Sequence, residues 1–157
     1  MSAPERKFVT ARIGGQLVGI PIARAREVFS PQAITPVPAA GKDIAGVLNL
    51  RGRIVTMIDL RSHFAMPAYA DGALAIGVDE GGDSYGLMVD ALDEVRRLAT
   101  EDIQENPVNL DEPLRRVSAG VCKVEDELLV VLDVDRILKT GAIASEERTG
   151  AAAPADE

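Results

Sequence analysis

The sequence has 157 residues, which suits one domain or two small ones. Apolar residues make up 46% and charged residues 27%, so most of the chain should fold around a core. The net charge is −8, and the chain has two Tyr, three Phe and no Trp. This composition argues against nucleic-acid binding, because phosphates attract clustered Lys and Arg and bases need aromatic stacking partners.

Cysteine, histidine and hydropathy exclude further classes of protein. The single cysteine, Cys122, has no partner for a disulfide within the chain, and one Cys with one His cannot supply a zinc site built from those residues. No apolar run approaches the ~20 residues of a membrane span, and the first residues lack the apolar core of a secretory signal. We therefore expect a cytoplasmic protein with no direct membrane insertion and no cofactor.

The first half of the chain begins with a leader expected over residues 1–7. Residues 8–22 have β-rich segments on both sides of a Gly-Gly pair, which predicts a hairpin. Residues 22–29 carry apolar side chains at helical spacing, which predicts a helix with Glu27 on its exposed side. Proline and glycine punctuate residues 35–43, which are typical of a loop.

Hairpins recur in the rest of the chain. Residues 46–59 are predicted to form a hairpin that turns at Arg51-Gly52-Arg53, followed by a short helix. Residues 73–95 again have the pattern of strand, Gly-rich turn and strand, and residues 120–133 form another predicted hairpin before a second short helix. Residues 141–157, rich in Ala and acids, are expected to be a disordered tail.

The chain also resembles itself. Residues 17–28 align with 84–95 at an offset of 67, and residues 46–64 align with 120–138 at an offset of 74. Identities are few, but glycines, apolar positions and the order of elements coincide. This repeat predicts two similar all-β units, either small barrels or a sandwich.

A search for catalytic residues finds nothing specific. His63 is the only histidine and sits in a predicted short helix, so a surface or structural role is the simpler interpretation. Asp59 and Asp133 could be the paired carboxylates of a small-molecule hydrolase. However, each precedes a predicted helix at equivalent places of the repeat, where an aspartate caps free backbone N–H groups. We therefore expect no enzymatic activity.

The repeat and its hairpins resemble the CheW family, the adaptor proteins of bacterial chemotaxis. The resemblance covers roughly residues 8–140, which we treat as one domain made of two similar subdomains. It rests on "LVGIPIARAREV", "ITPVP", "GVLNLRGRIVTMIDLR", "YGLMVDALDEV" and "GVCKVEDELLVVLDVDRIL".

The resemblance implies an all-β fold with a few short helices, in which two SH3-like five-stranded β-barrels pack together. It implies a non-catalytic adaptor that couples chemoreceptor tips to the regulatory domain of the histidine kinase CheA, in the cytoplasm at membrane-associated receptor arrays. The receptor tip would lie in an apolar groove between the barrels. The alternative is a CheW-like coupling protein of a chemosensory pathway that does not control motility.

The resemblance also points to particular residues. Glu27 and Arg51 match two characteristic charged residues of the family, and Ala25 matches a receptor-side position that is usually larger. Gly46 and Asn49 complete the hairpin motif. Because Arg can hold a carboxylate by two parallel hydrogen bonds, we expect an ion pair between Glu27 and Arg51.

The remaining candidate is Val47, an apolar strand position that could face a partner. Three positions depart from the pattern of the family. Gly41 stands where a proline is expected, Asp43 where an aromatic residue is frequent, and Thr56 where proline is common. A smaller Ala25 and a charged Asp43 would reduce the apolar contact with a receptor.

Overall fold

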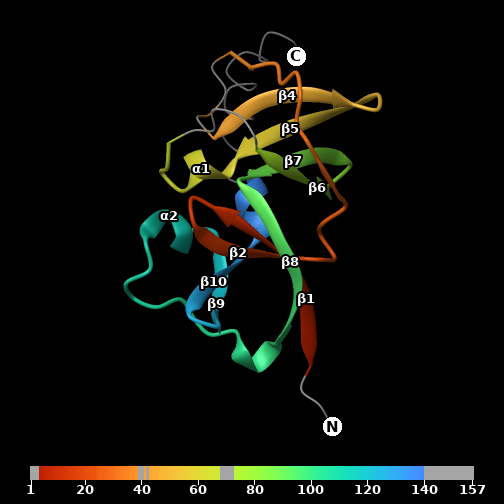
Figure 1. Ribbon diagram of the computed structural model, residues 1–157. Coiled ribbons are helices and arrows are strands. Elements are labelled where there is room, and N and C mark those ends of the chain that lie inside the picture. The colour runs from red at the N-terminus through yellow and green to blue at the C-terminus, as the bar shows by residue number, and fades with distance from the viewer. Residues whose placement is uncertain (1–3, 39–40, 42, 68–72, 140–157) are drawn as a thin grey trace.

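Two small β-sheets lie one above the other in the computed structural model of the chain (Figure 1). The structure describes residues 4–38, 41, 43–67 and 73–139. The first sheet contains, in spatial order, β8 (Ala91–Ala99), β1 (Glu5–Ile13), β2 (Gln16–Pro21), β10 (Glu127–Leu132) and β9 (Ser118–Val124). The second sheet contains β3 (Glu27–Phe29), β6 (Leu74–Glu80), β7 (Asp83–Val89), β5 (Arg53–Asp59) and β4 (Ile44–Leu50).

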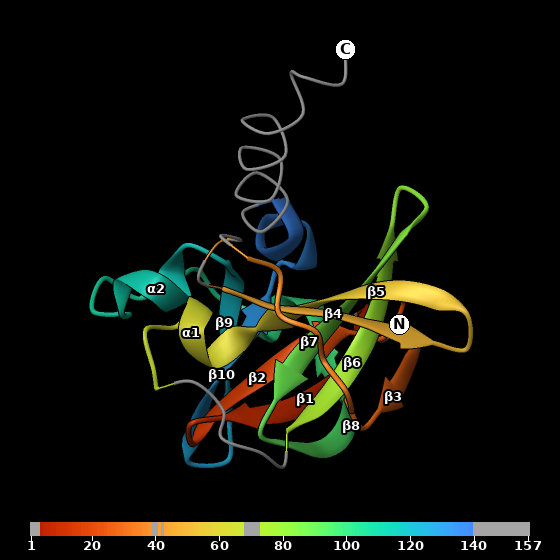
Figure 2. The same cartoon turned by 90° about the horizontal axis from the view of Figure 1, so that it is seen from above.

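Helices are short and lie at the margins of the sheets (Figure 2). They are α1 (Leu60–His63), the 3-10 turn η1 (Thr100–Asp102), α2 (Glu112–Arg115) and residues 134–139. Within the described part of the chain, none of them has the length and apolar character that crossing a membrane would require. The fold class predicted from the sequence, all-β with a few short helices, is confirmed.

The two sheets have the same strand order when β1–β5 are matched to β6–β10. Strands β2 and β10 pair in parallel in the first sheet, and their counterparts β7 and β5 pair in parallel in the second. The edge strands cross over, since β3 joins β6 and β8 joins β1. The internal repeat is therefore real in three dimensions, and each sheet combines two strands from one half of the chain with three from the other.

Three apolar clusters follow from the alternation of side chains along these strands. One cluster lies inside each sheet's barrel, and the third and largest lies between the two barrels. The interior of the first barrel holds Phe8, Leu17, Leu98, Cys122, Val124, Leu129 and Val131. The interior of the second holds Leu48, Val55, Met57, Ala75 and Met88, with Phe29 and Leu50 packed against them. The cluster between them includes Ile20, Ile58, Ile76, Leu87, Val130 and Ile137.

The predicted hairpins and helix caps are confirmed. Asp59 accepts a hydrogen bond from the backbone N–H of Ser62 at 3.1 Å, and Asp133 accepts one from that of Arg136 at 3.2 Å. Each aspartate therefore caps the short helix that follows it, in equivalent places of the repeat. This role explains the two carboxylates without any catalytic function.

The helix predicted over residues 22–29 is wrong. Residues 22–24 form a turn, and the chain then extends into β3. Strand β3 pairs with β6, with Glu27 opposite Gly77 and Phe29 opposite Ala75. Pairing with a strand about fifty residues away in the sequence overrides the local helical spacing of the apolar residues.

The start of the domain also differs from the expectation. Strand β1 begins at Glu5, because residues 5–7 pair with β8, so the predicted leader over residues 1–7 is too long. The Arg6 guanidinium lies 5.1 Å from the centre of the Phe8 ring, which helps to hold this end of the strand. The expected disordered tail, residues 141–157, lies outside the described residues.

The lone histidine and the lone cysteine are both buried. His63 is only 8% exposed, and its Nδ1 lies 3.1 Å from a carboxylate oxygen of Asp43. Cys122 packs inside the first barrel, where loss of solvent raises the pKa of its thiol. Both side chains are therefore part of the packed interior, which for His63 agrees with the structural role expected from the sequence, and the carboxylate of Asp43 faces the protein.

Candidate partner-binding site

The tip of the β4–β5 hairpin is a two-residue turn in which both residues have positive φ. Arg51 has φ 53° and Gly52 has φ 86°, values typical of the turn that matches the twist of a hairpin. The side-chain oxygen of Asn49 accepts a hydrogen bond from the N–H of Gly52 at 2.8 Å. Asn49 therefore shapes the turn, and the turn holds Arg51 in a conformation that costs a residue with a side chain some strain.

The predicted ion pair between Arg51 and Glu27 is present. One terminal nitrogen of Arg51, Nη2, donates to both carboxylate oxygens of Glu27, at 2.5 and 2.6 Å. The contact uses a single nitrogen, so the two parallel bonds that we expected do not form. The side chains are 66% and 40% exposed, respectively, so the pair lies at the surface, where a partner can reach it.

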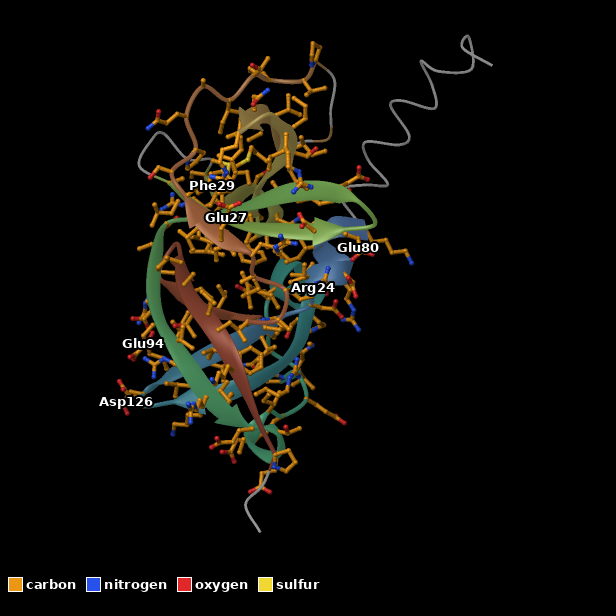
Figure 3. The ribbon with its side chains drawn as sticks, turned by 90° about the vertical axis from the view of Figure 1, so that its right-hand side faces the viewer. Arg24, Glu27, Phe29, Glu80, Glu94 and Asp126 are labelled. Carbon is orange, nitrogen blue, oxygen red and sulfur yellow. The ribbon has the colours of Figure 1, made fainter. Side chains whose placement is uncertain are left out.

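Glu27 reaches this position because β3 is a strand. Its neighbour across the sheet is Gly77, and the Cγ of Glu27 lies over this glycine, 3.4 Å from the place where a Cβ would stand. Phe29, two residues further along, points to the same side and packs against the interior of the second barrel. Figure 3 shows Glu27 and Phe29 together on this strand.

A surface groove of about 230 Å³ opens beside the ion pair. Its lining comes from β3, from β6 and β7, and from both sides of the β4–β5 tip. The apolar part is formed by Phe29, Leu50, Val55, Val78 and Tyr85. The charged part is formed by Arg26, Glu27, Arg51, Arg53 and Asp79. The groove therefore combines an apolar floor with a charged rim.

Two of the three arginines in this rim have carboxylate partners. Arg51 binds Glu27, and Arg26 binds Asp79 at 2.6 Å. Arg53 is exposed and forms no ion pair with any residue that the structure describes. The sequence analysis noted the Arg51-Gly52-Arg53 turn but gave Arg53 no role. The signal that could have identified it is its place two residues before Val55, on the same side of β5.

Gly46 and Val47 lie away from the ion pair, near the start of β4. Val47 and Thr35 exchange two backbone hydrogen bonds, of 2.7 and 2.9 Å. A Cβ on Gly46 would lie 2.3 Å from the carbonyl oxygen of Thr35. These two residues therefore fasten the loop before β4 to the hairpin. A Cβ on the equivalent glycine of the repeat, Gly120, would likewise lie 2.8 Å from the carbonyl oxygen of Gln104.

Ala25 lies in the segment that crosses from the first sheet to the second. It is partly buried and packs against the apolar cluster between the barrels. Its neighbour Arg24 binds Asp135 at 2.7 Å and Glu80 at 2.9 Å, and Figure 3 shows Arg24 and Glu80 close together. Sequence reasoning missed this double ion pair, because it joins three segments that are distant along the chain.

The matching hairpin tip of the first barrel has the same two-residue length and the opposite charge. Glu125, the counterpart of Arg51, has φ 57°, and Asp126 and Glu127 follow it in place of Gly52 and Arg53. Glu127 is bound by Arg12 of β1, with one N–O distance of 2.7 Å. The turn therefore does not depend on arginine, so the charges of the Arg51-Gly52-Arg53 tip are free to serve another purpose.

Comparison with known proteins identifies the family to which this fold belongs. The CheW-like domain matches residues 7–142. The chain belongs to the CheW-like family. Its relatives include a chemotaxis protein CheW of Rhizobium meliloti, which is 27% identical over 93% of this chain and 92% of the relative. The corresponding protein of Helicobacter pylori is 30% identical over 85% of this chain and 81% of the relative.

Two further similarities extend the CheW-like assignment. The protein FrzA of Myxococcus xanthus is 27% identical over 87% of this chain and 88% of its own. The crystal structure of the scaffolding protein TtCheW from Thermoanaerobacter tengcongensis has a TM-score of 0.73 and 27% sequence identity, and the match covers 83% of this chain and 86% of that one. The CheW-like fold predicted from the sequence is therefore confirmed by an experimental relative.

Proposed function

We propose that the chain is a non-catalytic scaffold that couples chemoreceptor tips to the histidine kinase CheA, in the cytoplasm at receptor arrays. The family match over residues 7–142 and relatives that bear the name chemotaxis protein CheW support this proposal. The observation that carries it is the exposed ion pair between Glu27 and Arg51, at the two positions where the sequence matches characteristic charges of that family.

The ion pair is better suited to recognition than to stability. Exposed pairs contribute only about 0–1 kcal/mol to folding, so stability alone does not account for this pair. Here the pair braces a strained turn against β3 and forms one wall of the groove. A braced turn presents its charges and the apolar floor in one fixed arrangement, which lowers the cost of ordering them on binding.

Binding measurements with purified fragments test this function. The chain should bind the regulatory domain of the kinase and the cytoplasmic tip of a receptor encoded in the same genome, measured separately by calorimetry. Absence of binding to both fragments would refute the proposed function.

A second candidate is a coupling protein for a chemosensory pathway that does not control motility. The relatives of the chain include one whose name does not mention chemotaxis, FrzA, so the family is not limited to proteins named for chemotaxis. Deletion of the gene separates the two, because the chemotaxis scaffold predicts loss of directed swimming with normal motility. Normal swimming together with an altered non-motility response would favour the second candidate.

A further inference from the structure

The groove beside the ion pair has a size that suits inserted side chains. Its volume of about 230 Å³ is below the roughly 300–1,000 Å³ of small-molecule sites. Its apolar floor contains Phe29, Leu50, Val55 and Tyr85, which lie on four different strands of the second barrel. Apolar surface surrounded by charge is the usual anatomy of the centre of a protein–protein contact.

Charge at the rim of the groove is opposite to that of the molecule. The chain carries a net charge of −8, yet the lining holds three arginines against the carboxylates of Glu27 and Asp79. The two carboxylates are used by Arg51 and Arg26, which leaves the positive charge of Arg53 without a partner among the described residues. An arginine is suited to a carboxylate because its planar guanidinium can donate two hydrogen bonds at once.

The fold does not require this positive charge. The equivalent hairpin of the first barrel makes its turn with Glu125, Asp126 and Glu127, and there the carboxylate of Glu127 is bound by Arg12 within the chain. In the second barrel the position of Arg12 is taken by Asp79, which binds Arg26. Arg12, Glu127 and Asp79 thus each have a charged partner within the chain. Arg53, the counterpart of Glu127, has none among the described residues.

We propose that this groove binds a protein segment that presents a bulky apolar side chain next to a carboxylate. The apolar side chain lies on Phe29, Leu50 and Val55, and the carboxylate binds Arg53. The inference rests on the proposed function, since it describes how a kinase or receptor surface would engage the hairpin. It adds the chemistry of the partner and assigns Arg53 as the residue that selects it.

Charge reversal of Arg53 tests the proposal. Arg53→Glu should weaken binding of the kinase or the receptor fragment at least tenfold, and Arg53→Lys should lose less, because the charge is kept. The matched control is Arg97→Glu, an exposed arginine of β8 that also has no ion pair within the described residues. Both reversals remove an exposed charge without a partner, so both variants should keep the wild-type melting temperature.

A second step identifies the carboxylate of the partner. Acidic residues of the bound fragment are changed to arginine one at a time, and one of these changes should restore the binding of Arg53→Glu. Wild-type affinity for both fragments in Arg53→Glu would overturn this inference and leave the proposed function intact. An effect confined to self-association in the ultracentrifuge would assign the groove to a second copy and overturn it as well. Failure of the wild-type chain to bind either fragment would overturn both proposals.

Discussion

At the scale of single residues, the ion pair between Glu27 and Arg51 connects β3 to the tip of the β4–β5 hairpin. Glu27→Ala and Arg51→Ala should each weaken binding of the partner, because each releases the other side chain from its fixed position. The double variant should lose less than the sum of the two, with a coupling energy of about 0.5–3 kcal/mol in calorimetric titrations. Strictly additive losses would mean that the two residues act independently.

Gly46 illustrates a residue whose role is structural. Gly46→Ala should lower the free energy of unfolding by at least about 2 kcal/mol, because φ is 147° and the new Cβ would overlap the carbonyl of Thr35. Gly52→Ala is the matched control, since its φ is 86° but no atom obstructs a Cβ there. It should cost only about 1 kcal/mol in urea denaturation. Equal losses in the two variants would show that the close approach to Thr35 does not matter.

At the scale of elements, local signals predicted the hairpins and caps well. The glycine pairs and the aspartates before α1 and residues 134–139 act within a few residues, so the sequence alone displays them. Strand β3 could not be predicted in this way, because its conformation is decided by pairing with β6. The same limit applies to the site. The pairing of Glu27 with Arg51 was predicted only through a family resemblance. The groove with Arg53 could not be predicted, because it is formed by segments that are distant along the chain.

The contact between β1 and the tip of β10 has a dependence on pH. Hydrogen bonds from Arg12 lower the pKa of Glu127 below its ordinary value of 4.5. A group with a lowered pKa in the folded state adds stability above its unfolded pKa and loses it as the pH falls through the folded one. Near neutral pH, the free energy of unfolding of wild type, measured in urea, should therefore exceed that of Glu127→Gln by a small and constant amount. This difference should vanish in acid. A difference that grows as the pH falls would contradict this assignment.

At the scale of the whole molecule, the two barrels are interdependent because each contains strands from both halves of the chain. A fragment of residues 1–67 would supply β1 and β2 without β8, β9 and β10, and β3, β4 and β5 without β6 and β7. It should therefore remain unfolded by NMR and circular dichroism, although a mixture with the complementary fragment could regain structure. Well-dispersed spectra from the isolated fragment would show that the halves are independent after all.

The same architecture connects the fold to its proposed task. The large apolar cluster between the barrels and the double ion pair of Arg24 hold the two hairpin tips at fixed places on one body. The tips have equal lengths and opposite charges, so the two barrels present different surfaces from one repeated design. A rigid body with two unlike surfaces is what a scaffold between two different partners requires.

The central claim is that the chain couples receptors to the kinase, and a reconstituted kinase assay tests it most directly. Purified CheA and receptor-containing membranes are combined with and without the chain, and phosphate transfer from ATP to the kinase is measured. The account predicts that the wild-type chain makes kinase activity depend on the receptor, and that Arg51→Ala reduces this effect while the variant stays folded. Kinase activity that is the same with and without the chain would contradict the account.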